Sequence, residues 1–269
     1  MRYPARLRGR AERTSISVKG TLSKSSEKKQ TSQRPAIFCD FDGTITRVDV
    51  TDEILAQLAH PSWREVEQEW TCGAIGSREC LARQMALVEA SAKELNALID
   101  AVAIDPDFAS FWRFIEECKL PFYVLSDSFD YIIRRVLKRA GVNGVLRNGT
   151  HMFASALRVE GRRLVTAFPH CAAPCEHGCA TCKPRIMRRL SGGRGPVVFI
   201  GDGLSDRFAV GEADVVFAKR QLLAYCRENG IACHQFATFA EIETALRDLV
   251  DAGRPRRQRG RSPKAKSGR

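Results

Sequence analysis

The segment Ala36-Ile37-Phe38-Cys39-Asp40-Phe41-Asp42-Gly43-Thr44 decides the fold of this 269-residue chain. Its first four residues are apolar and predict a short buried strand, and the acidic, glycine-containing residues that follow predict a turn. In open α/β sheets, ligands bind where the carboxyl ends of strands and the N-termini of helices converge. The segment therefore predicts an α/β fold with a functional site directly after its first strand.

Alternating strand and helix patterns extend this prediction over the second half of the chain. Strands are expected at residues 122–125, 197–200, 215–217 and 232–235. Helices are expected at residues 129–139, 205–212, 220–229 and 240–251. Such alternation builds a parallel sheet with helices on both faces, so the predicted fold class is α/β with a Rossmann-like doubly wound parallel sheet.

Two further segments modify this sheet. Helical patterns follow the first strand at residues 51–60, 63–70, 77–88, 92–102 and 107–119. The first four predict a helical cap (residues 47–107) inserted after the first strand, over the carboxyl edge of a core formed by residues 35–46 and 108–252. A weaker β pattern at residues 152–157 and 164–168 surrounds the turn residues Glu160-Gly161-Arg162 and predicts a β-hairpin accessory.

The net charge of +12 comes from the two ends of the chain. Residues 1–34 contain ten Lys or Arg and two Glu, residues 253–269 contain eight Lys or Arg and no acid, and the residues between them carry a net charge of −4. Both ends are predicted to be disordered basic tails, because they cannot bury enough apolar surface to fold. Non-specific contact with polyanions is favoured for them over a dedicated nucleic-acid arm.

The overall composition is that of an ordinary globular protein. Hydrophobic residues make up 44% and charged residues 28% of the chain, which excludes a fibrous or wholly disordered protein. The sequence lacks both a run of roughly 18 apolar residues, which could cross a bilayer, and the apolar block of a secretory signal. We therefore expect no membrane partner and a cytoplasmic location.

Three segments that follow predicted strands carry polar side chains. They are Asp40-Phe41-Asp42-Gly43-Thr44, Ser126-Asp127-Ser128 and Gly201-Asp202-Gly203-Leu204-Ser205-Asp206. In a doubly wound sheet all three reach the same edge, where their carboxylates would repel one another without a bound cation. Mg²⁺ suits this site because it prefers oxygen ligands and is often shared with a substrate phosphate. Asp40 could then attack phosphorus.

Together, these segments resemble the motifs of the haloacid dehalogenase superfamily of phosphohydrolases, over about residues 36–235. The superfamily pattern is Asp-x-Asp-x-Thr after a strand, a Ser or Thr at the end of a second strand, a Lys, and an acidic motif after a further strand. The resemblance implies that Asp40 is the nucleophile and Asp42 the general acid and base. The phosphate-binding groups that it implies are Thr44, Ser126 and Lys183. The Mg²⁺ ligands that it implies are Asp40, Asp42 and Asp202, with Asp206 in support.

The activity implied by this resemblance is that of a Mg²⁺-dependent phosphomonoesterase, which hydrolyses a small phosphorylated metabolite through an aspartyl-phosphate. A carboxylate is an adequate nucleophile for this reaction, because the transition state of phosphoryl transfer is loose and catalysis depends mostly on positioning. A closer resemblance is carried by Phe168-Pro169-His170-Cys171, by Cys179-Ala180-Thr181-Cys182-Lys183-Pro184 and by the position of the cap. These features are similar to the methionine-salvage branch, the 2-hydroxy-3-keto-5-methylthiopentenyl-1-phosphate phosphatases. Phosphoserine phosphatases share the cap position and remain the alternative.

Three of the implied roles have competing interpretations. Lys219 also follows a predicted strand and competes with Lys183, which the order of the motifs favours. Asp206 could instead be an acid at a helix N-terminus, where the helix dipole favours it. Ser128 replaces a residue that is commonly Gly in the superfamily, and a serine would be strained there if its φ were positive.

Four cysteines, Cys171, Cys175, Cys179 and Cys182, fall within twelve residues. Four thiolates can close a tetrahedral structural Zn²⁺ site, which here would fix Lys183. A reduced Cys-rich loop or a redox-labile pair is an equally open interpretation. A nucleic-acid-binding protein that uses a zinc knuckle and the basic tails is the alternative from another functional class. The net negative charge of the residues between the two tails argues against it.

Overall fold

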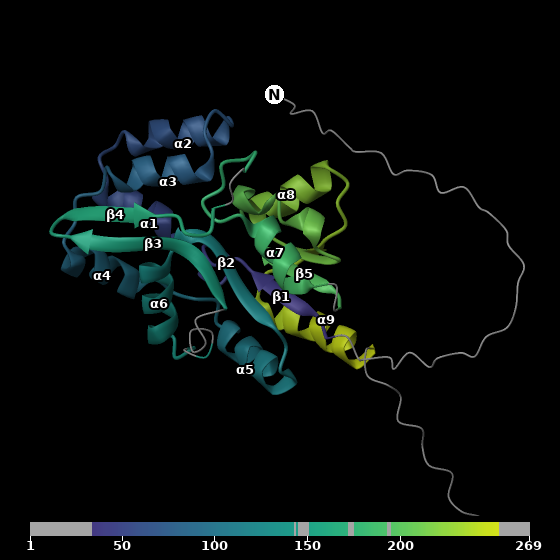
Figure 1. Ribbon diagram of the computed structural model, residues 1–269. Helices are drawn as coiled ribbons and strands as arrows, with labels where there is room; N and C mark the ends of the chain where they lie inside the picture. Colours follow the sequence, from purple (N-terminus) through teal and green to yellow (C-terminus); the bar gives the residue numbers. More distant parts are fainter. Residues whose placement is uncertain (1–33, 143, 145–150, 172–174, 193–194, 253–269) are drawn as a thin grey trace, which may run out of the picture. The chain divides into compact units, whose positions relative to one another are not determined.

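A seven-stranded sheet lies at the centre of the computed structural model, which describes residues 34–142, 144, 151–171, 175–192 and 195–252 (Figure 1). Its strand order is β4-β3-β2-β1-β5-β6-β7. The strands are β1 (Ala36–Cys39), β2 (Phe122–Phe129), β3 (Met152–Glu160), β4 (Arg163–Ala167), β5 (Val197–Gly201), β6 (Val215–Ala218) and β7 (His234–Gln235). Neighbouring strands are parallel except for β3 and β4. The α/β prediction is therefore confirmed.

The described residues belong to one compact unit. The predicted basic tails, residues 1–34 and 253–269, lie outside the described residues except for Arg34. The guanidinium of Arg34 donates a hydrogen bond of 3.1 Å to the carbonyl oxygen of Cys118. Disorder of the tails stays a prediction.

Helices cover both faces of the sheet because the side chains of each strand alternate between two apolar clusters. Ile37 and Cys39 of β1 belong to one cluster, and Phe38 belongs to the other. The first cluster is covered by α5 (Phe108–Cys118), α6 (Asp130–Arg139) and α9 (Phe239–Ala252). The second is covered by α7 (Lys183–Ser191) and α8 (Arg220–Glu228). This is the doubly wound arrangement predicted from the alternating patterns. In the described part of the chain, we find no helix with the length and apolar character of a membrane span.

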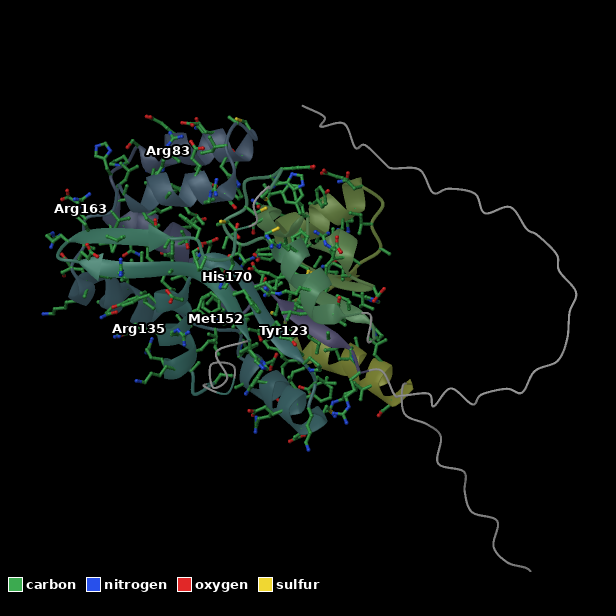
Figure 2. All side chains as sticks on the ribbon, in the orientation of Figure 1. Arg83, Tyr123, Arg135, Met152, Arg163 and His170 are labelled. Carbon is green, nitrogen blue, oxygen red and sulfur yellow. The ribbon has the colours of Figure 1, made fainter. Side chains whose placement is uncertain are left out.

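Four helices separate β1 from β2 in the chain. They are α1 (Val50–Leu58), α2 (Trp63–Thr71), α3 (Ser77–Met85) and α4 (Ala92–Ala101). Helix α4 is joined to α6 by Arg135, labelled in Figure 2, whose guanidinium donates two hydrogen bonds of 2.7 Å to the carboxylate of Asp100. The helical pattern predicted after the first strand is therefore correct. The division of the chain into a cap of residues 47–107 and a core stays a prediction.

Some predicted boundaries and shapes are wrong. Strand β2 runs to Phe129 and so includes Ser126-Asp127-Ser128, which were expected in a loop; its pairing with β3 is irregular between Leu125 and Phe129 and resumes with Phe129 opposite Ser155. The β3–β4 hairpin is correct in position, but it extends the main sheet because β3 is parallel to β2.

The segment after β5 also differs from its prediction. A helix was expected over residues 205–212, and the structure has two short 3₁₀ turns, Leu204–Asp206 and Val210–Glu212. The first turn is closed by the carboxylate of Asp206, which accepts a hydrogen bond of 3.2 Å from the amide of Gly203. An acid that bonds back to the start of its own turn favours a tight turn over a long helix. Strand β7 is also shorter than expected, with only His234–Gln235 paired to β6.

Candidate active site

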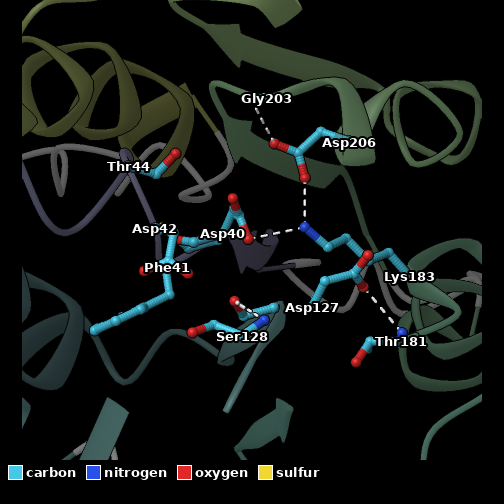
Figure 3. Close-up of polar contacts among 12 residues, drawn as sticks. Asp40, Phe41, Asp42, Thr44, Asp127, Ser128, Thr181, Lys183, Gly203 and Asp206 are labelled. Atoms are coloured by element: carbon cyan, nitrogen blue, oxygen red, sulfur yellow. Dashed lines mark hydrogen bonds and ion pairs between the residues drawn. The ribbon is translucent and has the colours of Figure 1, made fainter. Parts of the chain in front are cut away.

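Lys183 joins two carboxylates at the carboxyl edge of the sheet (Figure 3). Its Nζ donates a hydrogen bond of 2.8 Å to Oδ1 of Asp40, directly after β1, and one of 2.5 Å to Oδ1 of Asp206, after β5. The Lys183 side chain is only 1% exposed. Lys183 is the first residue of α7, where Pro184 suits the first helical turn because that turn needs no amide donor. The fold thus buries this lysine between two acids that are distant in sequence.

Asp202 lies beside this group, and its two oxygens have different donors. The hydroxyl of Thr44 donates to Oδ1 at 2.9 Å, and Nη1 of Arg220 donates to Oδ2 at 3.3 Å. The second oxygen of Asp206 accepts hydrogen bonds from the backbone amides of Asp202 and Gly203 at 3.1 and 3.2 Å. Asp206 therefore fixes both the ammonium of Lys183 and the turn that carries Asp202.

Asp42 faces the first helix after β1. Its oxygens accept hydrogen bonds from the amide of Val50 at 3.2 Å and from the hydroxyl of Thr51 at 3.3 Å. The Ser128 side chain also donates to Asp42. Asp42 thus lies between the end of β2 and the start of α1, two residues after Asp40.

The last residues of β2 supply hydroxyl and carboxylate groups to the same edge. The hydroxyl oxygen of Ser126 accepts a hydrogen bond of 3.1 Å from the amide of Ser128 (Figure 3). Among the described residues, the non-glycine residues with positive φ are Lys119 and Arg220, so Ser128 carries no such strain. Oδ1 of Asp127 accepts a hydrogen bond of 2.9 Å from the amide of Thr181. This bond connects β2 to the segment before Lys183.

The pKa shifts in this cluster show that its negative charge exceeds its positive charge. Burial and the neighbouring Asp206 raise the pKa of Asp40 well above its usual value, although Lys183 opposes this shift. Burial and Asp206 raise the pKa of Asp202 to about 6. Burial would lower the pKa of Lys183, but Asp206 and Asp40 raise it well above its usual value. The lysine is therefore held charged, and its charge does not compensate all the acids.

These residues fit a divalent cation. One carboxylate oxygen from each of Asp40, Asp202 and Asp206 lies within 4.8 Å of the others. A hard cation with oxygen ligands would relieve the repulsion that raises the pKa values of Asp40 and Asp202. The donor set therefore suits a hard divalent cation such as Mg²⁺.

A cavity of about 280 Å³ opens above this cluster. Its lower wall includes Asp40, Asp42, Ser126 and Asp202. Its opposite wall comes from α1, α2 and α3 and includes Asp52, Glu67, Trp70, Ser77 and Leu81. A small molecule in this cavity would touch the acidic cluster at one end and the α1–α3 helices at the other.

The structure brings together most of the residues expected from the sequence. Asp40, Asp42, Ser126 and Asp202 line the cavity, while Thr44 and Lys183 are buried against these acids. Lys219, the competitor of Lys183, donates instead to the carbonyl oxygen of Thr44 at 3.3 Å. Asp206 does stabilise its own turn, as the alternative interpretation proposed, and it also contacts Lys183.

The four clustered cysteines do not support the zinc prediction. In the part of the chain that the structure describes, the side-chain group suited to a metal ion is the aspartate triad, and Cys171, Cys175, Cys179 and Cys182 form no comparable group. All four are free thiols. The amide of Cys179 donates to the sulfur of Cys175 at 3.4 Å, so part of the segment is held by its own backbone.

Three residues of the site carried no role in the sequence analysis. Asp127 lay inside a quoted motif, but nothing in the sequence revealed its contact with Thr181. Arg220 reaches Asp202 from the start of α8, and Ser77 lines the cavity from the start of α3. Lone serines and arginines at helix starts are common in proteins, so no sequence signal distinguished these two.

Comparison with known proteins places the chain in a family. The profile of the haloacid dehalogenase-like hydrolases matches residues 37–209. A 2-hydroxy-3-keto-5-methylthiopentenyl-1-phosphate phosphatase of Geobacillus kaustophilus (strain HTA426) is 30% identical over 216 residues, which cover 79% of this chain and 96% of that protein. The protein of the same name from Bacillus velezensis (strain DSM 23117 / BGSC 10A6 / LMG 26770 / FZB42) is 28% identical and covers 80% of this chain and 91% of its own.

Solved structures show the same fold. A phosphoserine phosphatase with a phospho-aspartyl intermediate analogue superposes with a TM-score of 0.59 at 17% identity, over 79% of this chain and 98% of that chain. These relatives give no support to the nucleic-acid alternative, whose basic tails lie outside the described residues. From the family profile, the relatives and the fold, we conclude that the chain belongs to the haloacid dehalogenase-like hydrolase family and is a phosphoric monoester hydrolase.

Proposed function

We propose that this protein is a Mg²⁺-dependent phosphatase of a small phosphorylated metabolite and that it works through an aspartyl-phosphate on Asp40. The observation that carries the proposal is the contact of Lys183 with both Asp40 and Asp206, next to Asp202 and at one end of the cavity. Lys183 favours the ionised form of the Asp40 carboxylate and orients it toward a phosphoryl group, whose negative charge it also offsets.

The reaction has two steps. An oxygen of Asp40 forms a bond to phosphorus as the bond to the alkoxide leaving group breaks, and Asp42 gives its proton to the alkoxide. A water molecule then attacks the aspartyl-phosphate and gives a proton to Asp42, which releases inorganic phosphate and the free Asp40 carboxylate. Burial and the nearby Asp49 raise the pKa of Asp42 well above its usual value, which suits a group that must begin as an acid.

Asp40, Asp202 and the backbone carbonyl of Asp42 are the proposed Mg²⁺ ligands, with Asp206 as a supporting acid. Bound there, Mg²⁺ would supply positive charge opposite the phosphoryl oxygens. Thr44 orients the Asp202 carboxylate through its hydroxyl. Ser126, at the end of β2, is the proposed hydroxyl donor to the phosphate.

The leading candidate substrate is 2-hydroxy-3-keto-5-methylthiopentenyl-1-phosphate, the compound in the names of the relatives from Geobacillus and Bacillus. Trp70, Cys80 and Leu81 give the far wall of the cavity an apolar part, which suits a methylthio group. The proposal thus places the phosphate on the acidic cluster and the sulfur-containing tail against α2 and α3.

Phosphoserine, or another small phosphomonoester that carries an ammonium group, is the second candidate. The cavity is also lined by Asp49, Asp52 and Glu67, whereas Arg220 is the cation among the described residues that line it. Burial raises the pKa values of Asp52 and Glu67, so these acids lack a cationic partner that stabilises their ionised form. An ammonium group on the substrate would provide one.

A phosphatase panel with Mg²⁺ and then with EDTA tests the proposal. It should contain the methylthiopentenyl phosphate, phosphoserine and sugar phosphates without an amino group, with phosphate release as the measurement. We expect turnover with Mg²⁺ and its loss with EDTA, and the substrate with the highest kcat/KM decides between the two candidates. The absence of turnover on every phosphomonoester would refute the proposal.

The panel should be repeated with Glu67→Gln, which removes one acid from the far wall. If the substrate carries an ammonium group, its KM should rise by about tenfold, because a charge-assisted contact contributes about 1.5 kcal/mol or more. The KM of a substrate without an ammonium group should be unchanged or lower. The change in KM caused by Glu67→Gln therefore distinguishes the two candidate substrates.

A further inference from the structure

Three segments of the chain converge on Asp127 at the end of β2. The first is β3, whose Ser155 hydroxyl donates a hydrogen bond of 2.9 Å to the carbonyl oxygen of Asp127. The second is the segment before Lys183, where the amide of Thr181 donates to Oδ1 of Asp127 at 2.9 Å. The third is the start of α3, where the Ser77 hydroxyl lies beside the Asp127 carboxylate and opposes the rise in its pKa that burial causes. Asp127 therefore lies where two segments about a hundred residues apart meet.

The contact with Thr181 bears directly on Lys183, which lies two residues later. The Lys183 amide donates to the carbonyl oxygen of Thr181 at 2.8 Å, so the backbone between them is closed into a tight turn. Asp127 thus fixes the position of Thr181, two residues before α7 begins at Lys183. A shift of this turn would move the Nζ of Lys183 away from Asp40 and Asp206.

The contact with Ser77 bears on the far wall of the cavity. Ser77 begins α3, and its hydroxyl oxygen also accepts the amide of Ala180 at 3.0 Å. The amide of Arg78 donates to the carbonyl oxygen of Gly178 at 3.0 Å. The backbones of Gly76 and Gly178 pack so closely that a Cβ on Gly76 would lie 2.4 Å from that carbonyl oxygen. The start of α3 is therefore bound to the segment of residues 178–181.

We propose that Asp127 is a positioning residue that joins the docking of α3 over the cavity to the placement of Lys183 beside Asp40. This inference rests on the proposed function, because it assigns Lys183 a part in the reaction. A substrate that touches α3 would also stabilise the turn at Thr181. Lys183 thus keeps its place beside Asp40 only while α3 is docked over the cavity. The residues 178–181 transmit this constraint through backbone hydrogen bonds.

The kinetic test uses Asp127→Ala and Asp127→Asn. Asp127→Ala removes both acceptors, and we expect kcat to fall by tenfold to a hundredfold with less than about a threefold change in KM, because a displacement of about 1 Å at a reacting group has this scale of effect. The Asn side-chain oxygen can still accept the Thr181 amide, so Asp127→Asn should recover most of the lost kcat. A kcat within twofold of the wild type for Asp127→Ala would overturn the proposal.

A second readout follows the coupling without any substrate. Ser77→Ala leaves the Asp127–Thr181 bond intact, yet it should speed amide hydrogen exchange both at residues 76–80 and at residues 178–183 of the full chain. Ser77→Thr keeps the hydroxyl and should restore protection at both. Faster exchange confined to residues 76–80 would show that α3 and the lysine segment are independent, which contradicts the proposal.

The double variant Ser77→Ala, Asp127→Ala should lose no more kcat than Asp127→Ala alone, since both changes act on one junction. Matched controls are Ser91→Ala, which removes the N-cap hydroxyl of α4, and Asp100→Asn, which removes the ion pair with Arg135. Neither should alter kcat or exchange at residues 178–183. If the wild-type protein hydrolyses no phosphomonoester, the proposed function fails, while the exchange experiment still decides whether the junction exists.

Discussion

The hydroxyl of Thr44 donates a hydrogen bond of 2.9 Å to Oδ1 of Asp202, and it thereby links the turn after β1 to the turn after β5. Thr44 is completely buried. Because Arg220 donates to the other oxygen of Asp202, both oxygens of this carboxylate have a fixed orientation. Groups that orient a metal ligand in this way commonly affect metal affinity as strongly as the geometry of the ligands themselves.

Thr44→Val should therefore weaken Mg²⁺ binding. The substitution keeps the shape of the side chain and removes the donor, so the ionised form of Asp202 loses a stabilising contact. We expect the dissociation constant for Mg²⁺, measured by isothermal titration calorimetry, to rise by about tenfold. Thr166→Val on β4 is the matched control and should leave it unchanged. Equal affinities in the two variants would show that the hydroxyl does not orient the metal ligand.

Asp40→Asn tests the proposed nucleophile. The amide cannot form the aspartyl-phosphate, so phosphatase activity should fall by about a thousandfold or more. The fold should persist, because the substitution removes one charge from a cluster of acids that repel one another. Circular dichroism and the thermal midpoint check the fold, and Asp100→Asn is the exposed-acid control. Near-normal turnover in Asp40→Asn would exclude Asp40 as the nucleophile.

Lys183→Ala should impair both stability and activity. The change leaves Asp40 and Asp206 buried without the ammonium that contacts them. Breaking a buried ion pair in this way costs about 3–5 kcal/mol. We expect this loss in the free energy of unfolding in urea without Mg²⁺, and partial recovery with Mg²⁺, since a bound cation stabilises the native state. Lys219→Ala is the control, because the Lys219 ammonium contacts a carbonyl oxygen and not these acids.

The sequence predicted the parts of this site that follow strands, and it failed where contacts depend on tertiary packing. Asp40 and Asp202 could be placed at one edge because parallel strands align their carboxyl ends. The boundary of β2 was wrong, because β3 also pairs with Phe129, beyond the polar residues 126–128 that resemble a turn. The 3₁₀ turns after β5 were missed because the Asp206 carboxylate bonds back to its own backbone.

The roles proposed for Ser77 and Asp127 could not be predicted from the sequence for a second reason. Both depend on the meeting of α3 with residues 178–181, and that meeting requires two glycine backbones to pack against each other. Neither periodicity nor motif spacing encodes which glycines will meet. The zinc prediction is not supported, because the four cysteines do not form a group suited to a metal ion among the described residues.

Thr181→Val should stabilise the protein. The hydroxyl of Thr181 is buried and has no hydrogen-bond partner among the described residues. An unpaired buried hydroxyl costs about 1–3 kcal/mol, and valine has nearly the same shape. The contact of Thr181 with Asp127 uses its backbone amide, which the substitution retains. We expect the free energy of unfolding to rise by about 1 kcal/mol in urea titrations. A fall would mean that the hydroxyl is paired in solution.

The last prediction concerns pH. Burial and Asp206 raise the pKa of Asp202 to about 6, so the folded protein holds a proton there that the unfolded chain releases near pH 4. The contribution of Asp202 to stability without metal is therefore largest below about pH 4 and is lost as the pH rises through about 6. Mg²⁺ binds the ionised carboxylate, and for this reason stabilisation by Mg²⁺ must follow the opposite trend.

We expect the increase in thermal midpoint caused by Mg²⁺ to be small at about pH 5 and to grow up to about pH 7, as the proton on Asp202 ceases to compete with the cation. Thermal unfolding at several pH values, each with Mg²⁺ and with EDTA, measures this difference. Asp202→Asn has no proton to release and should show little stabilisation by Mg²⁺ at any pH. An equal effect of Mg²⁺ at about pH 5 and pH 7 in the wild type would mean that Asp202 is already ionised at the lower pH, or that the cation binds elsewhere.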